Sequence, residues 1–190
     1  MAELLVFHHV QGLTPGVVAF ADDLRGAGHT VHTPDLFDGR VFDSLDAGMH
    51  FARGIGFEEV LARGVAAANG LPDDLFYIGF SLGVLPAQKL AQTRSGARGA
   101  VLLHSCVPTE EFGSWPDDVP VQVHAMDADP LFVDDGDIDA ARALVAGAPN
   151  AVLYLYPGRE HLFTDASLPD YIAPAAELLR SRVLRFLSER

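Results

Sequence analysis

The chain has 190 residues, of which 49% are hydrophobic and 21% charged, as is typical of a globular domain large enough to bury a full core. Its formal net charge of −13 argues against binding to nucleic acid or to an anionic membrane, because both are themselves negatively charged. A single cysteine, Cys106, and a start (MAELLVFHHV) without the basic segment of a signal peptide together favour the cytoplasm.

Strand and helix patterns alternate from one end of the chain to the other. Short apolar runs bounded by turn residues predict strands over Leu4–His8, Thr30–Thr33, Leu75–Ile78, Ala100–His104, Val119–Met126 and Ala151–Tyr156. Apolar residues at helical spacing predict helices over Val17–Ala27, Phe57–Asn69, Val84–Ala91, Ile138–Ala146 and Tyr171–Leu187. Between these elements, Leu36–Ala52 has only a weak pattern, and we expect a long loop there.

This alternation predicts one α/β domain over residues 1–190. Strands that alternate with helices form a mostly parallel sheet with helices on both faces, joined by right-handed crossovers. We therefore expect a three-layer α/β fold with a sheet of about six strands. We expect no cap domain, because no segment is long enough to form one.

The pentapeptide Gly79-Phe80-Ser81-Leu82-Gly83 stands between the strand that begins at Leu75 and the helix that begins at Val84. A G-x-S-x-G sequence in this context places its serine on a sharp turn above the sheet edge, and its glycines let neighbouring backbone pass closely. The start of the following helix directs unpaired N–H groups toward the same place. The pentapeptide also occurs as a plain strand-to-helix turn, but the flanking strand and helix favour Ser81 as a nucleophile.

Two further reactive groups follow later strands: Asp129 comes after the strand that ends at Met126, and His161 after the last strand. Parallel strands bring their carboxyl ends to one edge of the sheet, where ligands bind. A serine hydroxyl needs a base to take its proton, and a histidine needs a carboxylate to fix its tautomer. The order Ser, Asp, His therefore predicts a triad of Ser81, Asp129 and His161, with Asp127 as the alternative acid.

The residues of this predicted triad, with the segments around them, resemble the dienelactone hydrolase family of the α/β-hydrolase superfamily. The similarity covers nearly the whole chain and includes the opening strand with His8, the segment Pro34-Asp35-Leu36-Phe37-Asp38-Gly39, the pentapeptide, Asp129-Pro130 and Tyr156–Phe163. It implies an α/β-hydrolase fold in which Ser81 is the nucleophile, Asp129 the acid and His161 the base. It also implies an oxyanion hole formed by the backbone N–H groups of Leu82 and Val10.

Three positions differ from the best-known members of the family. Ser81 stands where those members have cysteine, and His9 where they have a glutamate that interacts with that cysteine. Asp165 stands where they have an arginine that holds a substrate carboxylate, so we expect a preference for neutral substrates over anionic ones. His9 is accordingly expected to bind substrate.

Two other side chains are candidates for substrate contact. Arg159 lies shortly before His161 and is expected to be either a replacement anchor for a carboxylate or a solvated surface charge. Trp115 lies in the loop that follows the strand ending at His104, and we expect it to contact substrate.

The sequence thus predicts a serine hydrolase that acts on a small ester, lactone or related acyl compound through an acyl-enzyme. The alternatives are a binding module that keeps the fold and pocket without efficient turnover, and an acyl transferase. We expect no metal and no cofactor, since the histidines lack the spacing of a zinc site and no G-x-G-x-x-G follows the first strand. The expected partner is a small-molecule substrate, and the chain is expected to be a monomer or homodimer.

Overall fold

A computed structural model describes residues 1–189 of the chain. Within them, six strands form one sheet in the order β2-β1-β3-β4-β5-β6, with every neighbouring pair parallel. The strands are β1 (Glu3–Phe7), β2 (Thr30–His32), β3 (Leu75–Phe80), β4 (Gly99–Leu103), β5 (Val121–Met126) and β6 (Ala151–Tyr156). The predicted strands are confirmed, with no end displaced by more than two residues.

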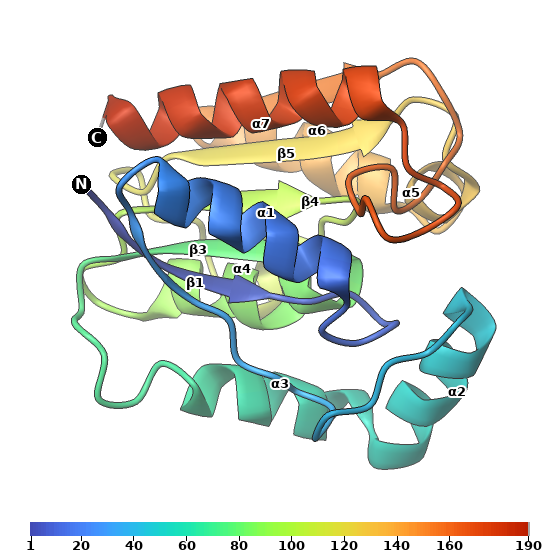
Figure 1. The fold of residues 1–190 in the computed structure, drawn as a ribbon. Coiled ribbons are helices and arrows are strands. Elements are labelled where there is room, and N and C mark those ends of the chain that lie inside the picture. The colour runs from blue at the N-terminus through green and yellow to red at the C-terminus, as the bar shows by residue number, and fades with distance from the viewer. Residues whose placement is uncertain (190) are drawn as a thin grey trace.

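Helices cover both faces of this sheet, as expected for a three-layer α/β fold (Figure 1). The α-helices are α1 (Pro15–Gly26), α2 (Leu45–Ile55), α3 (Phe57–Ala66), α4 (Val84–Thr93), α5 (Pro130–Val133), α6 (Asp137–Gly147) and α7 (Ala173–Ser188). Two short 3₁₀ turns, η1 (Ser81–Gly83) and η2 (Thr109–Glu111), complete the elements. No part of residues 1–189 forms a cap domain above the sheet.

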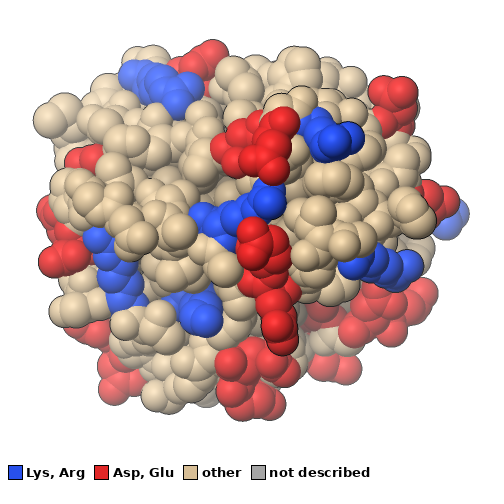
Figure 2. Space-filling model, turned by 90° about the horizontal axis from the view of Figure 1, so that it is seen from below, with Lys and Arg blue, Asp and Glu red and all other residues tan. Residues whose placement is uncertain are grey.

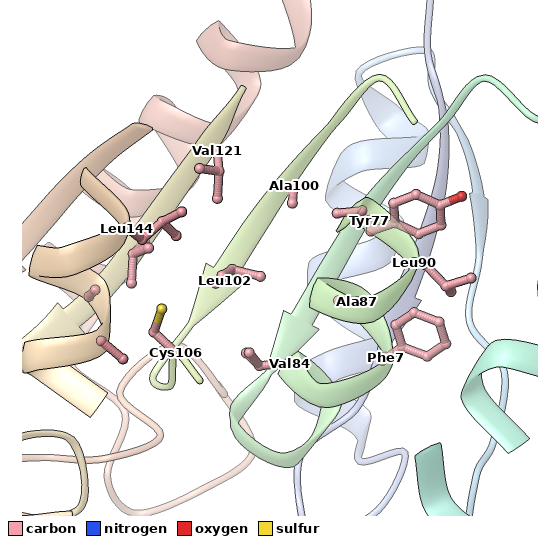
Figure 3. Packing of buried hydrophobic residues seen from close by; sticks show 14 of the residues in the cluster. Phe7, Tyr77, Val84, Ala87, Leu90, Ala100, Leu102, Cys106, Val121 and Leu144 are labelled. Atoms are coloured by element: carbon pink, nitrogen blue, oxygen red, sulfur yellow. The ribbon is translucent and has the colours of Figure 1, made fainter. Parts of the chain in front are cut away.

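The hydrophobic core has two parts, one on each face of the sheet. One part packs α1 and α7 against the sheet through side chains such as Phe20, Leu179 and Val183. The other lies under α3, α4 and α6 and includes Phe7, Tyr77, Leu102 and Leu144 (Figure 3). All six residues of β3 are buried, which fixes the strand that leads to Ser81 at the centre of the molecule.

The register of the sheet brings the ends of the central strands side by side. Phe7 at the end of β1 pairs with Gly79, and Phe80 at the end of β3 pairs with Leu103. The residues that follow β1, β3 and β4 therefore emerge at the same edge of the sheet. Turns after β5 and β6 lead to the same edge.

The expectation of a long loop over Leu36–Ala52 is wrong in its second half, where α2 begins at Leu45. The Ser44 side chain accepts a hydrogen bond from the Ala47 N–H, at 3.2 Å, and starts the helix. The buried residues of α2 are Gly48 and Ala52. Leu45, Met49 and Ile55 also pack partly buried against the core, so α2 does carry an apolar stripe at helical spacing. The scattered aspartates and aromatic residues of this segment hid that pattern in the sequence.

Charges of both signs are interspersed on the face of the molecule that α3 covers. Figure 2 shows Lys and Arg side chains next to Asp and Glu side chains there. Arg63, for example, contacts Asp38 at 2.8 Å and Glu59 at 2.9 Å. In the part of the chain that the structure describes, no helix is both long and apolar enough to cross a membrane.

Candidate active site

Ser81 lies directly after β3 on a sharp turn. Its φ of 48° is in the left-handed region, which non-glycine residues rarely adopt. The two glycines of the pentapeptide are required by close backbone contacts: a Cβ on Gly79 would lie 2.4 Å from the Gly83 carbonyl oxygen, and one on Gly83 would lie 2.5 Å from the Phe7 carbonyl oxygen. The strained turn lifts the Ser81 hydroxyl above the sheet edge.

The structure brings Ser81, His161 and Asp129 together from three different strand ends. The Ser81 Oγ lies 2.8 Å from Nε2 of His161, and Nδ1 of the same ring lies 2.6 Å from Oδ2 of Asp129. Asp129 is fully buried and also caps α5, because its Oδ1 accepts the Leu131 N–H at 3.0 Å. Asp127, the alternative acid, is exposed and accepts a hydrogen bond from Gly158.

These contacts define what the group can do chemically. The carboxylate of Asp129 accepts the Nδ1 proton of His161, which leaves Nε2 as an acceptor facing the Ser81 hydroxyl. In that tautomer the imidazole can take the serine proton while the carboxylate stabilises the resulting cation.

A model of the dienelactone hydrolase family matches residues 2–190. The chain belongs to the dienelactone hydrolase family. It is therefore a hydrolase, and the family resemblance seen in the sequence is confirmed. No curated protein matches the sequence.

Solved structures described as dienelactone hydrolases, as dienelactone hydrolase-like or as esterases share this fold. The dienelactone hydrolase-like promiscuous phosphotriesterase P91, from metagenomic libraries, is 22% identical, with 100% of this chain and 86% of that chain covered and a TM-score of 0.77. Dienelactone hydrolase from Anabaena variabilis is 18% identical, with 95% and 84% covered and a TM-score of 0.65. The propionate-bound esterase Est2 from Thermogutta terrifontis is 15% identical, with 97% and 83% covered and a TM-score of 0.69. At such identities the likeness shows an α/β-hydrolase fold.

Val10 and Leu82, the residues expected to supply the oxyanion hole, lie on adjacent segments. A Cβ on Gly83 would come within 2.6 Å of the His8 carbonyl oxygen, so the turn that contains Leu82 touches the end of β1. Helix α2 contacts the other side of this loop, where a Cβ on Gly48 would lie 2.1 Å from the Val10 carbonyl oxygen. The loop that contains Val10 is thus held between η1 and α2.

Two of the side chains expected to contact substrate lie elsewhere. His9 is fully buried, and its Nε2 lies 2.8 Å from Asp165, so it has no surface to offer a substrate. Trp115 is 8% exposed and donates its indole N–H to the Val119 carbonyl at 2.7 Å, near the amino end of β5 and therefore at the opposite sheet edge from Ser81. The expectation of substrate contact is wrong for both, because burial and internal hydrogen bonds occupy these side chains.

Arg159 is exposed and lines a pocket of about 330 Å³ beside His161 and Asp129. A second pocket, of about 360 Å³, shares Leu45 and Asp170 with the first and extends toward Gln11. A larger pocket of about 750 Å³ lies around the 92–98 and 116–120 segments and contains none of the triad side chains. We call these two pockets, which share Leu45 and Asp170, the substrate-binding region because they adjoin His161; Ser81 itself is not among their lining residues.

Cys106 is poorly suited to act as a competing nucleophile. Cys106 is buried, and burial, followed by the charge of Asp137, raises the pKa of its thiol to about 12, so little thiolate forms near neutral pH. Within residues 1–189 no three His, Cys, Asp or Glu side chains gather in a way that could hold a metal ion.

His104 is a residue near the triad that sequence reasoning did not select. It follows β4 with a φ of 68°, is fully buried, and its ring centre lies 5.8 Å from that of His161. Burial first, and then the nearby His161, lower the pKa of His104 well below its usual value, so it stays neutral beside the triad. The only signal in the sequence is its position at a strand end.

Proposed function

We propose that this member of the dienelactone hydrolase family is a serine hydrolase of small esters, lactones or related acyl compounds. The observation that carries the proposal is the continuous hydrogen-bonded chain from Ser81 through His161 to the buried Asp129. A serine nucleophile needs this arrangement, because the histidine takes the hydroxyl proton and the carboxylate orients the histidine and stabilises its charged form.

In the proposed reaction, Ser81 attacks the acyl carbon while His161 takes the hydroxyl proton. The negative oxygen of the tetrahedral intermediate is stabilised by the N–H groups of Leu82 and Val10. His161 then donates its proton to the leaving alcohol, and an acyl-enzyme remains on Ser81. Attack by water, activated by the same histidine, releases the acid and restores the hydroxyl.

The substrate-binding region supports a small substrate without a strong negative charge. Its two pockets, of about 330 and 360 Å³, suit compounds of modest size. Their walls carry more carboxylates than cations: Arg159 is accompanied by Asp43, Asp46, Glu160 and Asp170. We therefore propose a preference for neutral over anionic substrates, since a carboxylate would meet like charges here. Asp165, which suggested this preference from the sequence, does not contribute to it, because it is buried.

Two further parts of this proposal concern the acceptor of the acyl group and the cellular compartment in which the enzyme works. Water is the proposed acceptor of the acyl group, because the family to which the chain belongs is one of hydrolases. We also propose that the enzyme works in the cytoplasm, which the single Cys106 favours.

The test is labelling with a fluorophosphonate probe, combined with hydrolysis of short-chain nitrophenyl esters. We expect a stoichiometric adduct on Ser81, identified by peptide mass. We also expect Ser81→Ala to lose about a millionfold in kcat while remaining folded. Cys106→Ala is the matched control and should retain activity.

Lack of an adduct and of ester hydrolysis in the folded protein would instead favour the binding module. Activity of more than a few per cent in Ser81→Ala would show that another residue is the nucleophile.

A further inference from the structure

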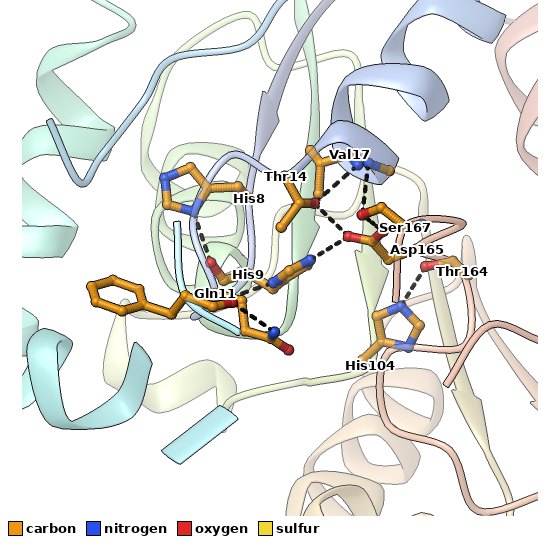
Figure 4. Close-up of polar contacts among 11 residues, drawn as sticks. His8, His9, Gln11, Thr14, Val17, His104, Thr164, Asp165 and Ser167 are labelled. Atoms are coloured by element: carbon orange, nitrogen blue, oxygen red, sulfur yellow. Dashed lines mark hydrogen bonds and ion pairs between the residues drawn. The ribbon is translucent and has the colours of Figure 1, made fainter. Parts of the chain in front are cut away.

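His9 and Asp165 form a buried hydrogen bond between two loops that are 156 residues apart (Figure 4). Nδ1 of His9 accepts the Gln11 N–H at 3.2 Å, so the ring proton lies on Nε2. Nε2 then donates this proton to Oδ2 of Asp165 over 2.8 Å. Both side chains are fully buried, and neither lines the substrate-binding region, so the bond offers no surface to a substrate.

Asp165 is held in place by several donors besides His9. The Thr14 hydroxyl donates to Oδ2, and the Ser167 N–H and hydroxyl donate to Oδ1 at 2.8 and 2.6 Å. Burial by itself would raise the pKa of Asp165, but the hydrogen bonds from His9, Ser167 and Thr14 lower it to about 2. A Cβ on Gly16 would lie 1.7 Å from Oδ1, so the carboxylate fits only because that residue is glycine. The carboxylate is therefore charged and fixed in position.

Each of the two bonded residues is close in the chain to a residue of the proposed catalytic machinery. His9 immediately precedes Val10, whose N–H is the proposed oxyanion donor. Asp165 lies four residues after His161, the proposed general base. The loop from His161 to Asp165 has a second tie, because Thr164 bonds to Nε2 of His104 at 2.7 Å (Figure 4). The bond between His9 and Asp165, next to the one from Thr14, thus joins the loop of the oxyanion donor to the loop of the general base, and His9 is the residue of this link adjacent to Val10.

We propose that His9 and Asp165 are a positioning pair that sets the Val10 N–H relative to His161 and Ser81. This inference rests on the proposed serine hydrolase function. Neither residue touches substrate, so the pair acts only through the placement of the two loops. The pair therefore stabilises the transition state more than bound substrate, because only in the transition state does the Val10 N–H donate to the oxyanion while His161 holds the serine proton.

The expected effect is a loss of kcat with little change in KM. Complete loss of one oxyanion donor costs on the order of 10²–10³ in kcat. Contacts with η1 and α2 continue to hold the Val10 loop when the His9 bond is absent, so displacement is partial. We therefore expect His9→Leu to lower kcat about 10- to 100-fold. We expect KM to stay within about threefold, because the substrate-binding walls are unchanged.

The experiment compares His9→Leu, His9→Gln and Asp165→Asn with the wild type. Each enzyme is titrated for reactive Ser81 with a fluorophosphonate, so that kcat is expressed per active site, and thermal unfolding confirms the fold. His9→Gln retains an N–H at the position of Nε2 and should recover most of the kcat that His9→Leu loses. Glu3→Gln is the matched control: it alters another histidine–carboxylate bond, to His32 at 2.7 Å, away from the site, and should leave kcat unchanged.

Three results would overturn the inference. They are an unchanged kcat per titrated site in folded His9→Leu, a change confined to KM, and an equal loss of kcat in His9→Leu and His9→Gln. If His9→Leu does not fold, a wild-type kcat in folded Asp165→Asn overturns it in the same way, and a 10- to 100-fold loss there supports it. Failure of the proposed function itself is recognised separately, because the wild type would then show no hydrolysis that depends on Ser81.

Discussion

Replacement of His8 by glutamine should change how the stability of the protein depends on pH. His8 is fully buried; its Nδ1 donates to the His9 carbonyl at 2.8 Å, and its Nε2 accepts the Leu36 N–H at 2.9 Å. Burial is the main cause that lowers the pKa of His8 from 6.5 to about 4, and the ring of His9 lowers it further. The hydrogen bond to the His9 carbonyl and the charge of Asp35, 3.6 Å away, oppose this less strongly. Below pH 6.5 the unfolded chain therefore binds a proton that the folded chain does not accept.

The size of the effect follows from these two pKa values. Stability contributed by neutral His8 is fully present above pH 6.5 and is lost as the pH falls toward 4. Between pH 7.5 and pH 5 a single group with these values removes about 2 kcal/mol of unfolding free energy. His104 and His124, whose pKa values are also lowered by burial, contribute equally to wild type and variant, and so cancel in the comparison.

The assay is urea unfolding of wild type and His8→Gln at several pH values between 5 and 7.5. The difference in unfolding free energy between the two proteins at pH 7.5 is first subtracted from the difference at every other pH. We then expect the wild type to lose about 2 kcal/mol more than His8→Gln on going to pH 5. Parallel curves for the two proteins would show that His8 binds a proton in the folded state as readily as in the unfolded one, which would refute the reasoning.

Three further predictions concern catalysis. Asp129→Asn should lower kcat by about 10⁴, because His161 then takes the wrong tautomer; steady-state ester hydrolysis measures this. Gly48→Ala should lower kcat about tenfold, since its Cβ would lie 2.1 Å from the Val10 carbonyl oxygen and displace the oxyanion loop. Of two short esters of equal size, the neutral one should have the higher kcat/KM, and Arg159→Ala should leave that order unchanged.

Each of these predictions has its own control. Asp127→Asn, at an exposed carboxylate, should keep kcat within about threefold, and a larger loss there than in Asp129→Asn would reverse the choice of acid. Gly54→Ala, also in α2, has open space around its Cβ and should not reduce kcat; equal effects of the two glycine changes would point to the helix as a whole. An advantage of the anionic ester that disappears in Arg159→Ala would identify that arginine as a carboxylate anchor.

Much of this fold is determined by local patterns in the sequence. Apolar runs and turn residues locate the six strands, because each buried strand of a parallel sheet must be apolar on both faces. The pentapeptide around Ser81 and the order of Asp129 and His161 locate the reactive groups, because parallel strands deliver their ends to one edge. Helix α2 was missed although Leu45, Met49 and Ile55 stand at helical spacing and pack against the core, because scattered aspartates and aromatic residues obscure that pattern.

Only the tertiary structure decides what the side chains next to these groups do. His9 looked like a substrate contact and Asp165 like a charge in the pocket, but they are buried against each other. Likewise, Trp115 bonds to Val119 at the opposite edge of the sheet. No local pattern encodes a contact across 156 residues, since it depends on how two loops from distant strands meet. The sequence determines which reactive groups reach the edge of the sheet, and the packing of the loops determines which of them face a substrate and which hold the others in place.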